Sequence, residues 1–367
     1  MKVLQIITGL APGGAERLLL DMTSRFDRDR FEVRVATMVN ELSALAIYGH
    51  ENIPVDVFEF RGNRKISALR QMRALVRSFA PDLIHAHMFH GLIGAFAVSR
   101  FRAEPPALCF TSHLNAYPSG RRLVVQALKR WRAADIIFTD GQHPAMNASC
   151  TEVIPNGVPV ASQPHSRQPW NPASPVRLLA VGRLADQKDP LGLLRAFAKA
   201  GLPNAVLTFI GAGPLEDDAR QLAKQLGLST HVKFLGTRQD VRDLMREADI
   251  FVMHSKYEGM PMALLEAGAE AMPCIVTPVG SIPDVIGHDR GWLAASDHFA
   301  ETLCRVVSEP AAAIEAGRRL HRHVLHNHSL EQTTRQHESL YRRIMQRVAP
   351  DTYRKISAGY ISEVAAE

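Results

Sequence analysis

The sequence has 367 residues, of which 46% are hydrophobic and 22% are charged. This length is too great for one typical domain and suits two domains that each bury a core of their own. The composition is that of a globular protein, which excludes a disordered chain. No run of eighteen uninterrupted apolar residues is present, and the strand-like segment after Met1 is too short for a signal peptide, so we expect a cytosolic protein.

The formal net charge of +6 is unevenly distributed along the chain. Between Arg61 and Arg132 there are thirteen Lys or Arg residues against two acidic residues, so this stretch carries +11 and the remainder −5. Such a basic stretch suits an anionic partner: a membrane, a polyphosphate carrier lipid or nucleic acid. The four cysteines lack C-x-x-C spacing, which predicts reduced and mostly buried thiols.

The first half of the chain alternates strand-like and helix-like segments. A β-branched run from Lys2 to Thr8 precedes Gly13 and Gly14, and an amphipathic helix is predicted from Ala15 to Phe26. Further strands are predicted at 32–38, 55–60, 83–87, 107–112 and 135–139, and helices at 41–49, 66–79, 91–101 and 121–133. This alternation predicts a parallel sheet with helices on both faces, whose ligands gather at the carboxyl ends of the strands.

Gly13 and Gly14 do not belong to a G-x-G-x-x-G motif, so a plain NAD-binding domain is not supported. They permit close approach of the backbone by a ligand phosphate or by an acceptor at the helix N-terminus. A tight turn between strand and helix is the alternative interpretation.

A proline-rich segment from Val153 to Pro175 separates the two halves of the chain. We expect a first domain at 1–160, a linker at 161–175, a second domain at 176–328, a final helix at 329–348 and a loosely held tail at 349–367. In the second domain, predicted strands at 176–181, 205–210, 231–235 and 248–253 alternate with helices at 189–200, 215–227 and 238–247. Ser329 and Gln332 have the spacing of a capping box that opens the final helix.

The stretch from His254 to Ala271 carries the clearest chemical signal. Pro261 suits the first position of a helix, whose free N–H groups at Met262 and Ala263 would attract a phosphate. Glu258 lies in the turn before this helix, and Glu266 lies within it. Two carboxylates beside an anion site can each bind a pair of sugar hydroxyls, one on either side of a diphosphate, which predicts a site for a nucleotide sugar.

Two cations follow the first strand of the second domain, in the segment GRLADQKD. Arg183 and Lys188 at this spacing can hold a diphosphate, the arginine as a fork and the lysine as a point charge. They would also stabilise a departing nucleoside diphosphate, so that no metal is required.

The E-x(7)-E spacing in YEGMPMALLEAGA, followed by PCIVT and GSIPDVI, resembles the donor-site signature of the family-4 retaining glycosyltransferases, which have the GT-B fold. Other signatures of that family follow in the expected order: GLAPGGAERLLLDM, DLIHAH, VIPNGV, VGRLADQKD, FIGAGP and VKFLGTRQDV. The resemblance implies an α/β chain with two Rossmann-like, doubly wound domains facing a central cleft. It also implies that the C-terminal helix crosses back to the first domain, which binds the acceptor.

The resemblance implies roles for further residues. His113 would contact the transferring sugar from the first domain, although a loop or capping role is the alternative. Gly14, Gly211 and Arg238 would lie near the donor, the last of them near the base. The segment GSIPD carries Ser281 and Asp284 where relatives usually have Gly and Glu, which alters the contacts expected of that loop.

The segment RRLVVQALKRWR at 121–132 combines apolar residues at helical spacing with arginines and lysine, as in helices that lie on anionic lipid. We therefore name Gly13, Arg122, Arg130 and Trp131 as candidate acceptor or membrane contacts, with a solvated helix face as the alternative. No nucleic-acid motif is present, so nucleic acid is not an expected partner. His85 and His87 share one face of a strand but lack spaced acidic or thiol partners, and HRHVLHNH at 321–328 is interpreted as a solvated face, so no metal site is predicted.

Together these patterns predict a peripheral enzyme of the inner membrane face that transfers a hexose from a nucleotide diphosphate sugar to a hydroxyl. A UDP-sugar is favoured over a GDP-sugar, and the basic stretch suggests a lipid-linked glycan acceptor in polysaccharide biosynthesis. A same-face attack assisted by the leaving phosphate is expected from the family, with no cofactor. The alternatives are another GT-B enzyme, a sugar phosphorylase or epimerase, and a non-catalytic module that binds sugar nucleotides or polyanions.

Overall fold

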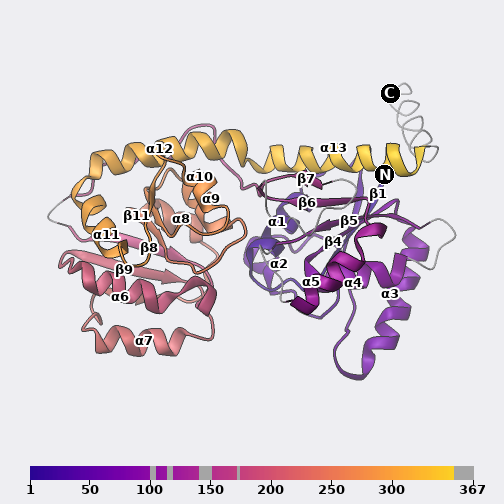
Figure 1. The fold of residues 1–367 in the computed structure, drawn as a ribbon, viewed down its shortest axis with the longest axis horizontal. Coiled ribbons are helices and arrows are strands. Elements are labelled where there is room, and N and C mark those ends of the chain that lie inside the picture. The colour runs from indigo at the N-terminus through magenta and orange to yellow at the C-terminus, as the bar shows by residue number, and fades with distance from the viewer. Residues whose placement is uncertain (100–104, 114–118, 140–150, 172–173, 351–367) are drawn as a thin grey trace. The chain divides into compact units, whose positions relative to one another are not determined.

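The structure is a computed structural model that describes residues 1–99, 105–113, 119–139, 151–171 and 174–350. The chain forms two compact units. Of the described residues, the first unit contains those up to Pro155 together with 331–350, and the second contains those from Asn156 to Leu330. Each unit is an α/β domain built on its own sheet (Figure 1).

The first unit contains a seven-stranded sheet in the order β3-β2-β1-β4-β5-β6-β7, in which every pairing is parallel. Its strands are β1 (Lys2–Ile7), β2 (Glu32–Thr37), β3 (Val55–Val57), β4 (Leu83–His87), β5 (Ala107–Thr111), β6 (Ala134–Ile137) and β7 (Thr151–Val153). Because side chains alternate along a strand, Leu4 and Ile6 enter one hydrophobic cluster while Gln5 points to the opposite face.

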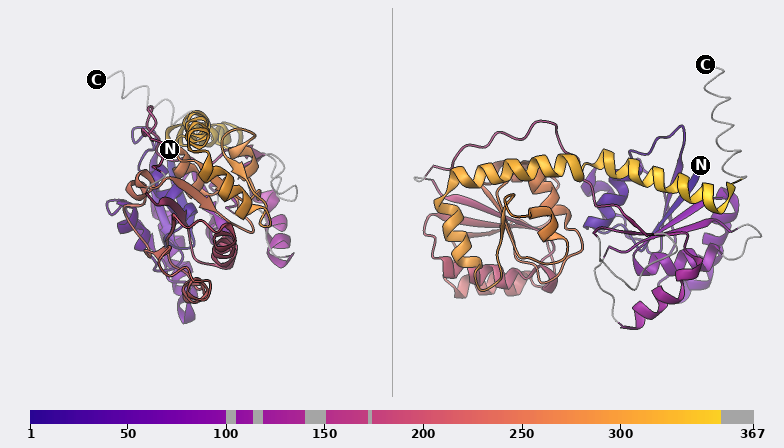
Figure 2. Two further views of the ribbon diagram at one scale, coloured as in Figure 1. Left: turned by 90° about the vertical axis from the view of Figure 1, so that its left-hand side faces the viewer. Right: turned by 45° about the horizontal axis from the view of Figure 1, so that its top comes forward.

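Helices cover both faces of this sheet (Figure 2). The helical segments are α1 (Gly14–Thr23), α2 (Ser43–Tyr48), η1 (Gly62–Arg64), α3 (Lys65–Phe79), α4 (Met88–Ser99), α5 (Ser119–Ala127), η2 (Lys129–Trp131) and α13 (Leu330–Val348). Met72 of α3 and Leu92 of α4 pack in the cluster with Leu4, whereas Leu19 of α1 and Ala44 of α2 form a second cluster with Ile7.

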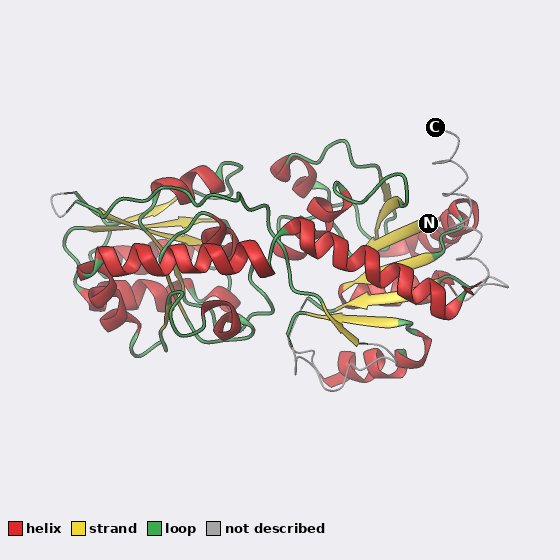
Figure 3. Cartoon of the chain, turned by 90° about the horizontal axis from the view of Figure 1, so that it is seen from above, coloured by secondary structure: helices red, strands yellow, loops and turns green. Residues whose placement is uncertain are grey.

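The C-terminal helix α13 lies across the strands of the first sheet (Figure 3). Its Tyr341 is fully buried and stacks on Phe26 at a ring distance of 5.9 Å. Thr333 near its start donates to the carbonyl of Pro155 at 3.1 Å, and Arg347 near its end donates to the carbonyl of Ala133. The expected return of the final helix to the first domain is therefore confirmed.

The second unit contains a six-stranded parallel sheet in the order β10-β9-β8-β11-β12-β13. Its strands are β8 (Val176–Val181), β9 (Ala205–Ile210), β10 (Val232–Phe234), β11 (Ile250–Met253), β12 (Cys274–Val276) and β13 (Trp292–Leu293). Its helical segments are η3 (Asp186–Lys188), α6 (Pro190–Ala200), α7 (Glu216–Gln225), α8 (Val241–Glu247), α9 (Met262–Ala269), α10 (Ile282–Ile286), α11 (Phe299–Ser308) and α12 (Pro310–Asn327). The predicted fold, two parallel Rossmann-like sheets, is confirmed.

The expected linker segment is attached to the second unit. Arg167 is buried and donates from three guanidinium nitrogens to the carbonyls of Glu270, Ala248 and Met245 at 2.9, 2.5 and 2.7 Å. Trp170 donates to the carbonyl of Val307 at 3.0 Å. These contacts hold the proline-rich segment against the unit that follows it.

Some elements differ from the sequence-based expectation. The strand expected at 55–60 ends at Val57, and the short strands β7 and β13 were not predicted. The helix expected at 121–133 is α5 followed, after Leu128, by the tighter turn η2. Among the described residues Cys109, Cys274 and Cys304 form no disulfide, and Cys150 lies outside them.

Candidate functional site

The predicted diphosphate-binding loop of the second unit follows β8 and lies at the carboxyl end of the sheet. Arg183 is exposed and makes no ion pair with any described residue, whereas Lys188 is half-buried. A small pocket at this edge is lined by residues of this loop, of β11 and of the segment after β11, among them Gly182, Arg183, Lys188 and His254. Both predicted cations thus border one pocket at the edge where ligands of such sheets bind.

Glu258 is the buried partner of Lys188. Its Oε1 lies 2.6 Å from the Lys188 ammonium, and Gln187 donates to its other carboxylate oxygen at 3.4 Å. Only 5% of the Glu258 side chain is exposed, so the ion pair compensates a carboxylate that would be costly to bury alone. Two residues that the sequence places seventy positions apart therefore form one charged pair.

Two further side chains, of Asn156 and Ser281, hold the turn after Glu258. Asn156 donates from its side-chain amide to the carbonyl of Met260 at 2.9 Å. Ser281 donates through both its hydroxyl and its backbone N–H to the carbonyl of Gly259, at 2.8 and 3.1 Å. Asn156 and Ser281 are both buried. Ser281 thus fixes the turn that carries Glu258.

Helix α9 begins directly after this turn, with Pro261 at its N-cap position. Met262 is buried and Ala263 is half-buried in the first turn, and Glu266 is half-buried one turn further on. Glu258 before the helix, the first-turn N–H groups and Glu266 therefore follow one another in the predicted order. Their assignment to a ligand stays a prediction.

His254 was not singled out by the sequence, yet it borders the same pocket. It is buried, and its Nδ1 lies 3.0 Å from the carboxylate of Asp189. Asp189 also accepts from the backbone N–H of Gly192 at 3.1 Å, which caps α6. Burial lowers the pKa of His254 even though Asp189 acts against this shift, so the imidazole is neutral near pH 7.

Gly211 and Gly213 approach protein backbone closely. A Cβ atom on Gly211 would lie 2.2 Å from the carbonyl oxygen of Gly182, and one on Gly213 would lie 2.3 Å from that of Leu184. Gly211 also has a φ of +124°, which favours glycine. The two glycines therefore let the loop after β9 pack against the loop that carries Arg183, and the donor contact of Gly211 stays a prediction.

Arg238 lies in the exposed loop after β10. Its guanidinium binds both carboxylate oxygens of Asp240 at 2.8 and 2.6 Å, and this bonding raises the pKa of the guanidinium. The structure thus pairs Arg238 with a neighbouring carboxylate, and its contact with the base stays a prediction.

In the first unit, Gly13 is the N-cap residue of α1 and Gly14 is its first residue. The Glu16 carboxylate folds back over Gly13, where a Cβ atom would lie 2.4 Å from Oε2. Burial raises the pKa of Glu16 to about 7. Gly13 therefore makes room for a carboxyl group that the sequence analysis did not single out.

His113 is half-buried at the end of β5, and its Nε2 lies 3.1 Å from Nδ1 of His87. The two rings stack with their centres 5.4 Å apart, and the Phe138 ring is tilted against that of His113 at a centre distance of 5.6 Å. The predicted shared face of His85 and His87 is observed, with the rings 4.1 Å apart. No cluster of three potential metal ligands occurs among the described residues.

The basic segment of the first unit is only partly an exposed face. Arg122 and Leu123 of α5 are exposed, as is Arg130, whose guanidinium lies 4.0 Å from the centre of the Trp131 ring. Trp131 itself is half-buried and packs on Phe96 at 4.9 Å.

Arg132 is not part of this surface. It is fully buried in an ion pair with Asp135, with Nε 2.6 Å from the carboxylate, and donates to the carbonyl of Val125 at 2.6 Å. The interpretation of 121–132 as one continuous amphipathic helix is therefore wrong at its C-terminal end, because that end turns inward to the core. No helix in the described parts of the chain is both long and apolar enough to cross a membrane.

The histidine-rich run at 321–328 is also not a simple solvated face. His321 and His328 are buried, and they bind the carbonyls of Ala161 and Asn156 at 3.0 and 3.1 Å. Burial lowers the pKa of His328 to about 4. These imidazoles hold the residues that follow the first unit against α12.

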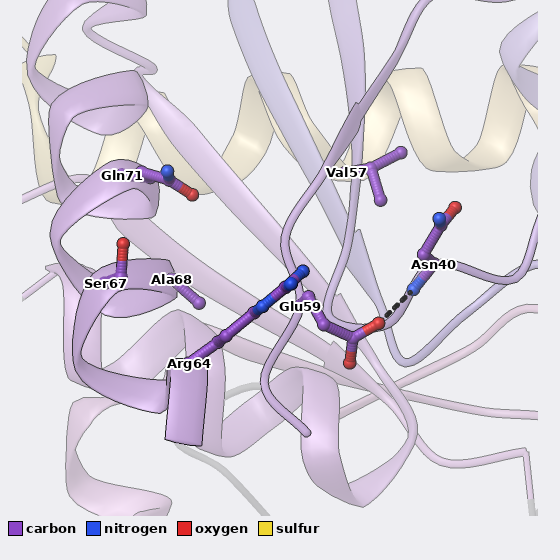
Figure 4. A pocket seen from close by; sticks show the side chains of 7 residues that line it. All are labelled: Asn40, Val57, Glu59, Arg64, Ser67, Ala68 and Gln71. Atoms are coloured by element: carbon purple, nitrogen blue, oxygen red, sulfur yellow. Dashed lines mark hydrogen bonds between the residues drawn. The ribbon is translucent and has the colours of Figure 1, made fainter. Parts of the chain in front are cut away.

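A second pocket, of about 460 Å³, lies in the first unit beyond the carboxyl ends of β2 and β3 (Figure 4). Glu59 accepts from the backbone N–H groups of Asn40 and Arg61, and this bonding lowers the pKa of its carboxyl group. The lining is mostly polar: Asn40, Val57, Glu59, Arg64, Ser67, Ala68 and Gln71.

Comparisons with known families cover most of the chain. Residues 162–320 match the family described as "Glycosyl transferases group 1", and residues 12–162 match "Glycosyltransferase Family 4". EpsF of Bacillus subtilis (strain 168), named as a glycosyltransferase, is 26% identical over 344 residues, which are 84% of this chain and 88% of that protein. The UDP-Gal:alpha-D-GlcNAc-diphosphoundecaprenol alpha-1,3-galactosyltransferase of Escherichia coli is 26% identical over 67% of this chain and 73% of its own length.

Solved structures show the same fold. Anabaena Alr3699/HepE in complex with UDP-glucose has a TM-score of 0.80 and 21% identity, covering 93% of this chain and 99% of that one. The lipopolysaccharide outer core galactosyltransferase WaaB, in its apo form, has a TM-score of 0.70 and 16% identity over 93% of this chain and 99% of its own. At these identities the structural likeness establishes the two-domain architecture.

Proposed function

Because the chain belongs to glycosyltransferase family 4, with the GT-B fold, we propose that it transfers a hexose from a UDP-sugar to a hydroxyl of a lipid-linked glycan. The observation that carries this proposal is the ion pair of Lys188 with buried Glu258 beside the start of α9. This pair combines a cation for a diphosphate with a carboxylate for sugar hydroxyls. The names of the Escherichia coli relative and of the Anabaena complex, which include UDP-Gal and UDP-glucose, support UDP as the nucleotide.

In this proposal Arg183 and Lys188 bind the diphosphate. Lys188 has three N–H donors and uses one on Glu258, so two are left for phosphate oxygens. Arg183, which is exposed at the edge of the same pocket, adds a fork of donors. Both cations would also stabilise the charge that develops on the leaving diphosphate, so the proposed reaction does not depend on a divalent metal.

The carboxylates are assigned to hydroxyls. Glu258 would bind hydroxyls of the transferred hexose, and Glu266 would bind those of the ribose, with the N–H groups of Met262 and Ala263 directed at phosphate. We further propose retention of the anomeric configuration, through same-face attack assisted by the leaving phosphate. His113 would bind a hydroxyl of the transferred sugar, as the family resemblance implies.

The acceptor is assigned to the first unit. The polar pocket beyond β2 and β3 offers carboxylate, amide, hydroxyl and guanidinium groups, which suit the hydroxyls of a glycan (Figure 4). Exposed Arg122, Arg130 and Leu123 suit the anionic surface in which a lipid-linked acceptor is embedded. We therefore propose a peripheral enzyme on the inner face of the cell membrane.

A panel of nucleotide sugars tests the donor assignment. UDP, GDP and ADP forms of glucose, galactose, N-acetylglucosamine and mannose are compared by thermal shift and by slow nucleotide release, with EDTA throughout. We expect at least one UDP-sugar to raise the melting temperature and to release UDP, and the Lys188→Met variant to lose most of that shift. If no nucleotide sugar raises the melting temperature, the donor assignment of Lys188 and Glu258 is wrong.

A further inference from the structure

A group of buried polar side chains lies on the face of the first sheet that α13 covers. Gln5 of β1 is paired in register with His85 of β4, so both point to this face together with His87 two residues further on. The hydroxyl of Tyr341, in α13, forms hydrogen bonds with Gln5 and His85. All four side chains are buried, with exposed fractions of 0 to 2%. Polar groups buried this deeply are expected to be hydrogen-bonded to one another.

The hydrogen bonds form one continuous chain. At the inner end, Nε2 of His85 lies 2.7 Å from the hydroxyl of Thr111, and its Nδ1 lies 2.6 Å from the hydroxyl of Tyr341. The side-chain amide of Gln5 links Tyr341, at 3.2 Å, to Nε2 of His87, at 2.7 Å.

The outer end of this chain is His113. Nδ1 of His87 lies 3.1 Å from Nε2 of His113. Because every ring nitrogen of His85 and His87 is engaged, the protonation of one imidazole determines that of the next.

The distances indicate the direction in which the protons point. A separation of 3.2 Å is normal for an N–H donor but long for an O–H donor, so the Gln5 amide nitrogen donates to the Tyr341 oxygen. The Gln5 carbonyl then accepts from Nε2 of His87, which leaves Nδ1 of His87 without a proton. That nitrogen can only accept, and the group that donates to it is Nε2 of His113.

Burial also keeps these imidazoles neutral. Burial lowers the pKa of His85 and His87 well below the usual value, and lowers that of His113 to about 3. His337 of α13 adds to this effect on all three. A neutral His113 that is protonated on Nε2 has a bare Nδ1.

We propose that Tyr341, Gln5 and His87 are positioning residues that hold His113 as its neutral Nε2–H tautomer, so that Nδ1 accepts a hydroxyl of the transferred sugar. An acceptor nitrogen also places negative partial charge toward the positive charge that develops at the anomeric carbon, whereas an imidazolium would oppose it. The role of Nδ1 rests on the proposed function, but the tautomer itself follows from the hydrogen bonds among the buried side chains.

The tautomer is measured in the unsubstituted protein. Long-range 1H–15N correlation spectra of the full chain labelled with [15N]histidine distinguish a protonated from a bare ring nitrogen, and a His113→Asn variant identifies the His113 signals. We expect Nε2 of His113 to be protonated and Nδ1 to be bare from pH 5.5 to 8. An Nδ1–H tautomer, or an imidazolium at pH 7, would overturn the proposal.

Matched variants then connect the tautomer to turnover. His87→Leu removes the acceptor and should mix the two tautomers of His113, whereas His87→Asn keeps an oxygen near the position of Nδ1 and should restore the spectrum. For the UDP-sugar that the wild type turns over, kcat should fall about tenfold or more in His87→Leu and recover at least partly in His87→Asn. The KM for the donor should change less, because the diphosphate contacts are in the second unit.

His337→Leu is the control, since His337 is buried in the same cluster but binds the carbonyl of Thr333 in its own helix at 2.8 Å. It should leave the His113 tautomer and kcat unchanged. If His113 has mixed tautomers in His87→Leu but kcat does not fall, the hydrogen-bonded series from Tyr341 to His113 has no role in catalysis. Absence of turnover in the wild type, with the expected tautomer, would instead contradict the proposed function alone.

Discussion

At the scale of single residues, the pair of Lys188 and Glu258 is the feature with the most direct consequence for activity. We predict that Glu258→Gln lowers kcat/KM for hexose transfer by roughly 10- to 150-fold. This range corresponds to the loss of one hydrogen bond to a charged group, which contributes about 1.5–3 kcal/mol. The affinity for UDP should fall much less, because UDP lacks the sugar. Steady-state kinetics and calorimetric titration with UDP measure the two effects separately.

Asp186→Asn provides the matched control for this substitution. Asp186 lies in the same loop as Lys188, but its carboxylate is exposed and pairs with exposed Lys256. The change from carboxylate to amide should therefore have little effect on activity. Equal losses in Asp186→Asn and Glu258→Gln, or full activity in the latter, would exclude a specific role for Glu258.

A second residue-scale prediction concerns Ser281. Its hydroxyl donates to the carbonyl of Gly259 in a buried position, and the backbone N–H of Ser281 keeps that carbonyl bonded in the variant, so Ser281→Ala should lower the free energy of unfolding of the second unit by about 0.5–1.5 kcal/mol. The KM for the donor should also rise, because the turn that carries Glu258 is less well held. Denaturant unfolding followed by the kinetics of the folded variant would show both effects; unchanged values for both would exclude this role.

The sequence identified Lys188 and Glu258 through their local motifs, but it did not identify the residues that hold them. Asn156 acts on Met260 across 104 positions, and His254 acts on Asp189 across 65. Such contacts depend on which strands become neighbours in the sheet. No local pattern carries that information, so Asn156, His254 and the Gln5–Tyr341 link could be found only in the structure.

At the scale of elements, the segment that contains α5 and the turn η2 has two kinds of apolar residue, which pack in the core or lie on the surface. The sequence pattern did not distinguish them. The apolar residues Val125 and Leu128 are buried in the core, whereas Leu123 is 66% exposed beside Arg122. Helical periodicity alone cannot distinguish these two kinds of apolar residue. For the same reason the strands β7 and β13, with three and two residues, were too short to show a period.

This division predicts different outcomes for substitutions in the segment. Arg122→Gln combined with Leu123→Gln should weaken sedimentation with vesicles that contain phosphatidylglycerol and should leave stability unchanged. Trp131→Ala should instead destabilise the first unit, since Trp131 packs on Phe96 and against the core. If the double variant sediments as well as the wild type, this helix does not bind lipid.

At the scale of the whole molecule, buried neutral histidines predict the effect of pH on stability. The pKa of His85 and His87 lies well below the usual value, and that of His113 and His337 is lowered to about 3 and about 4, in each case mainly by burial. In the unfolded chain these groups bind protons near pH 6.5. Their contribution to stability is therefore present above pH 6.5 and is lost as the pH falls toward 4.

Glu16 has the opposite effect on how stability depends on pH. Burial raises its pKa to about 7, so its contribution is present below pH 4.5 and is lost as the pH rises through 7. Four histidines outweigh one carboxyl group, and we predict that the first unit becomes less stable between pH 6.5 and 4.5. Hydrogen exchange of first-unit peptides measures this directly, and Glu16→Gln should make the loss steeper. Constant or increasing protection on acidification would contradict the assignment of neutral imidazoles.

The measurement that most directly tests the proposed function is transfer itself. The full chain is incubated with each UDP-hexose, vesicles containing undecaprenyl-diphosphate-linked sugars, and EDTA, and the lipid product is analysed by mass spectrometry and by NMR of the anomeric proton. We predict that one UDP-hexose adds a single hexose with the anomeric configuration of the donor, and that Glu258→Gln forms this product much more slowly. Transfer with inverted configuration, a requirement for divalent metal, or no transfer from any UDP-hexose would contradict the proposal.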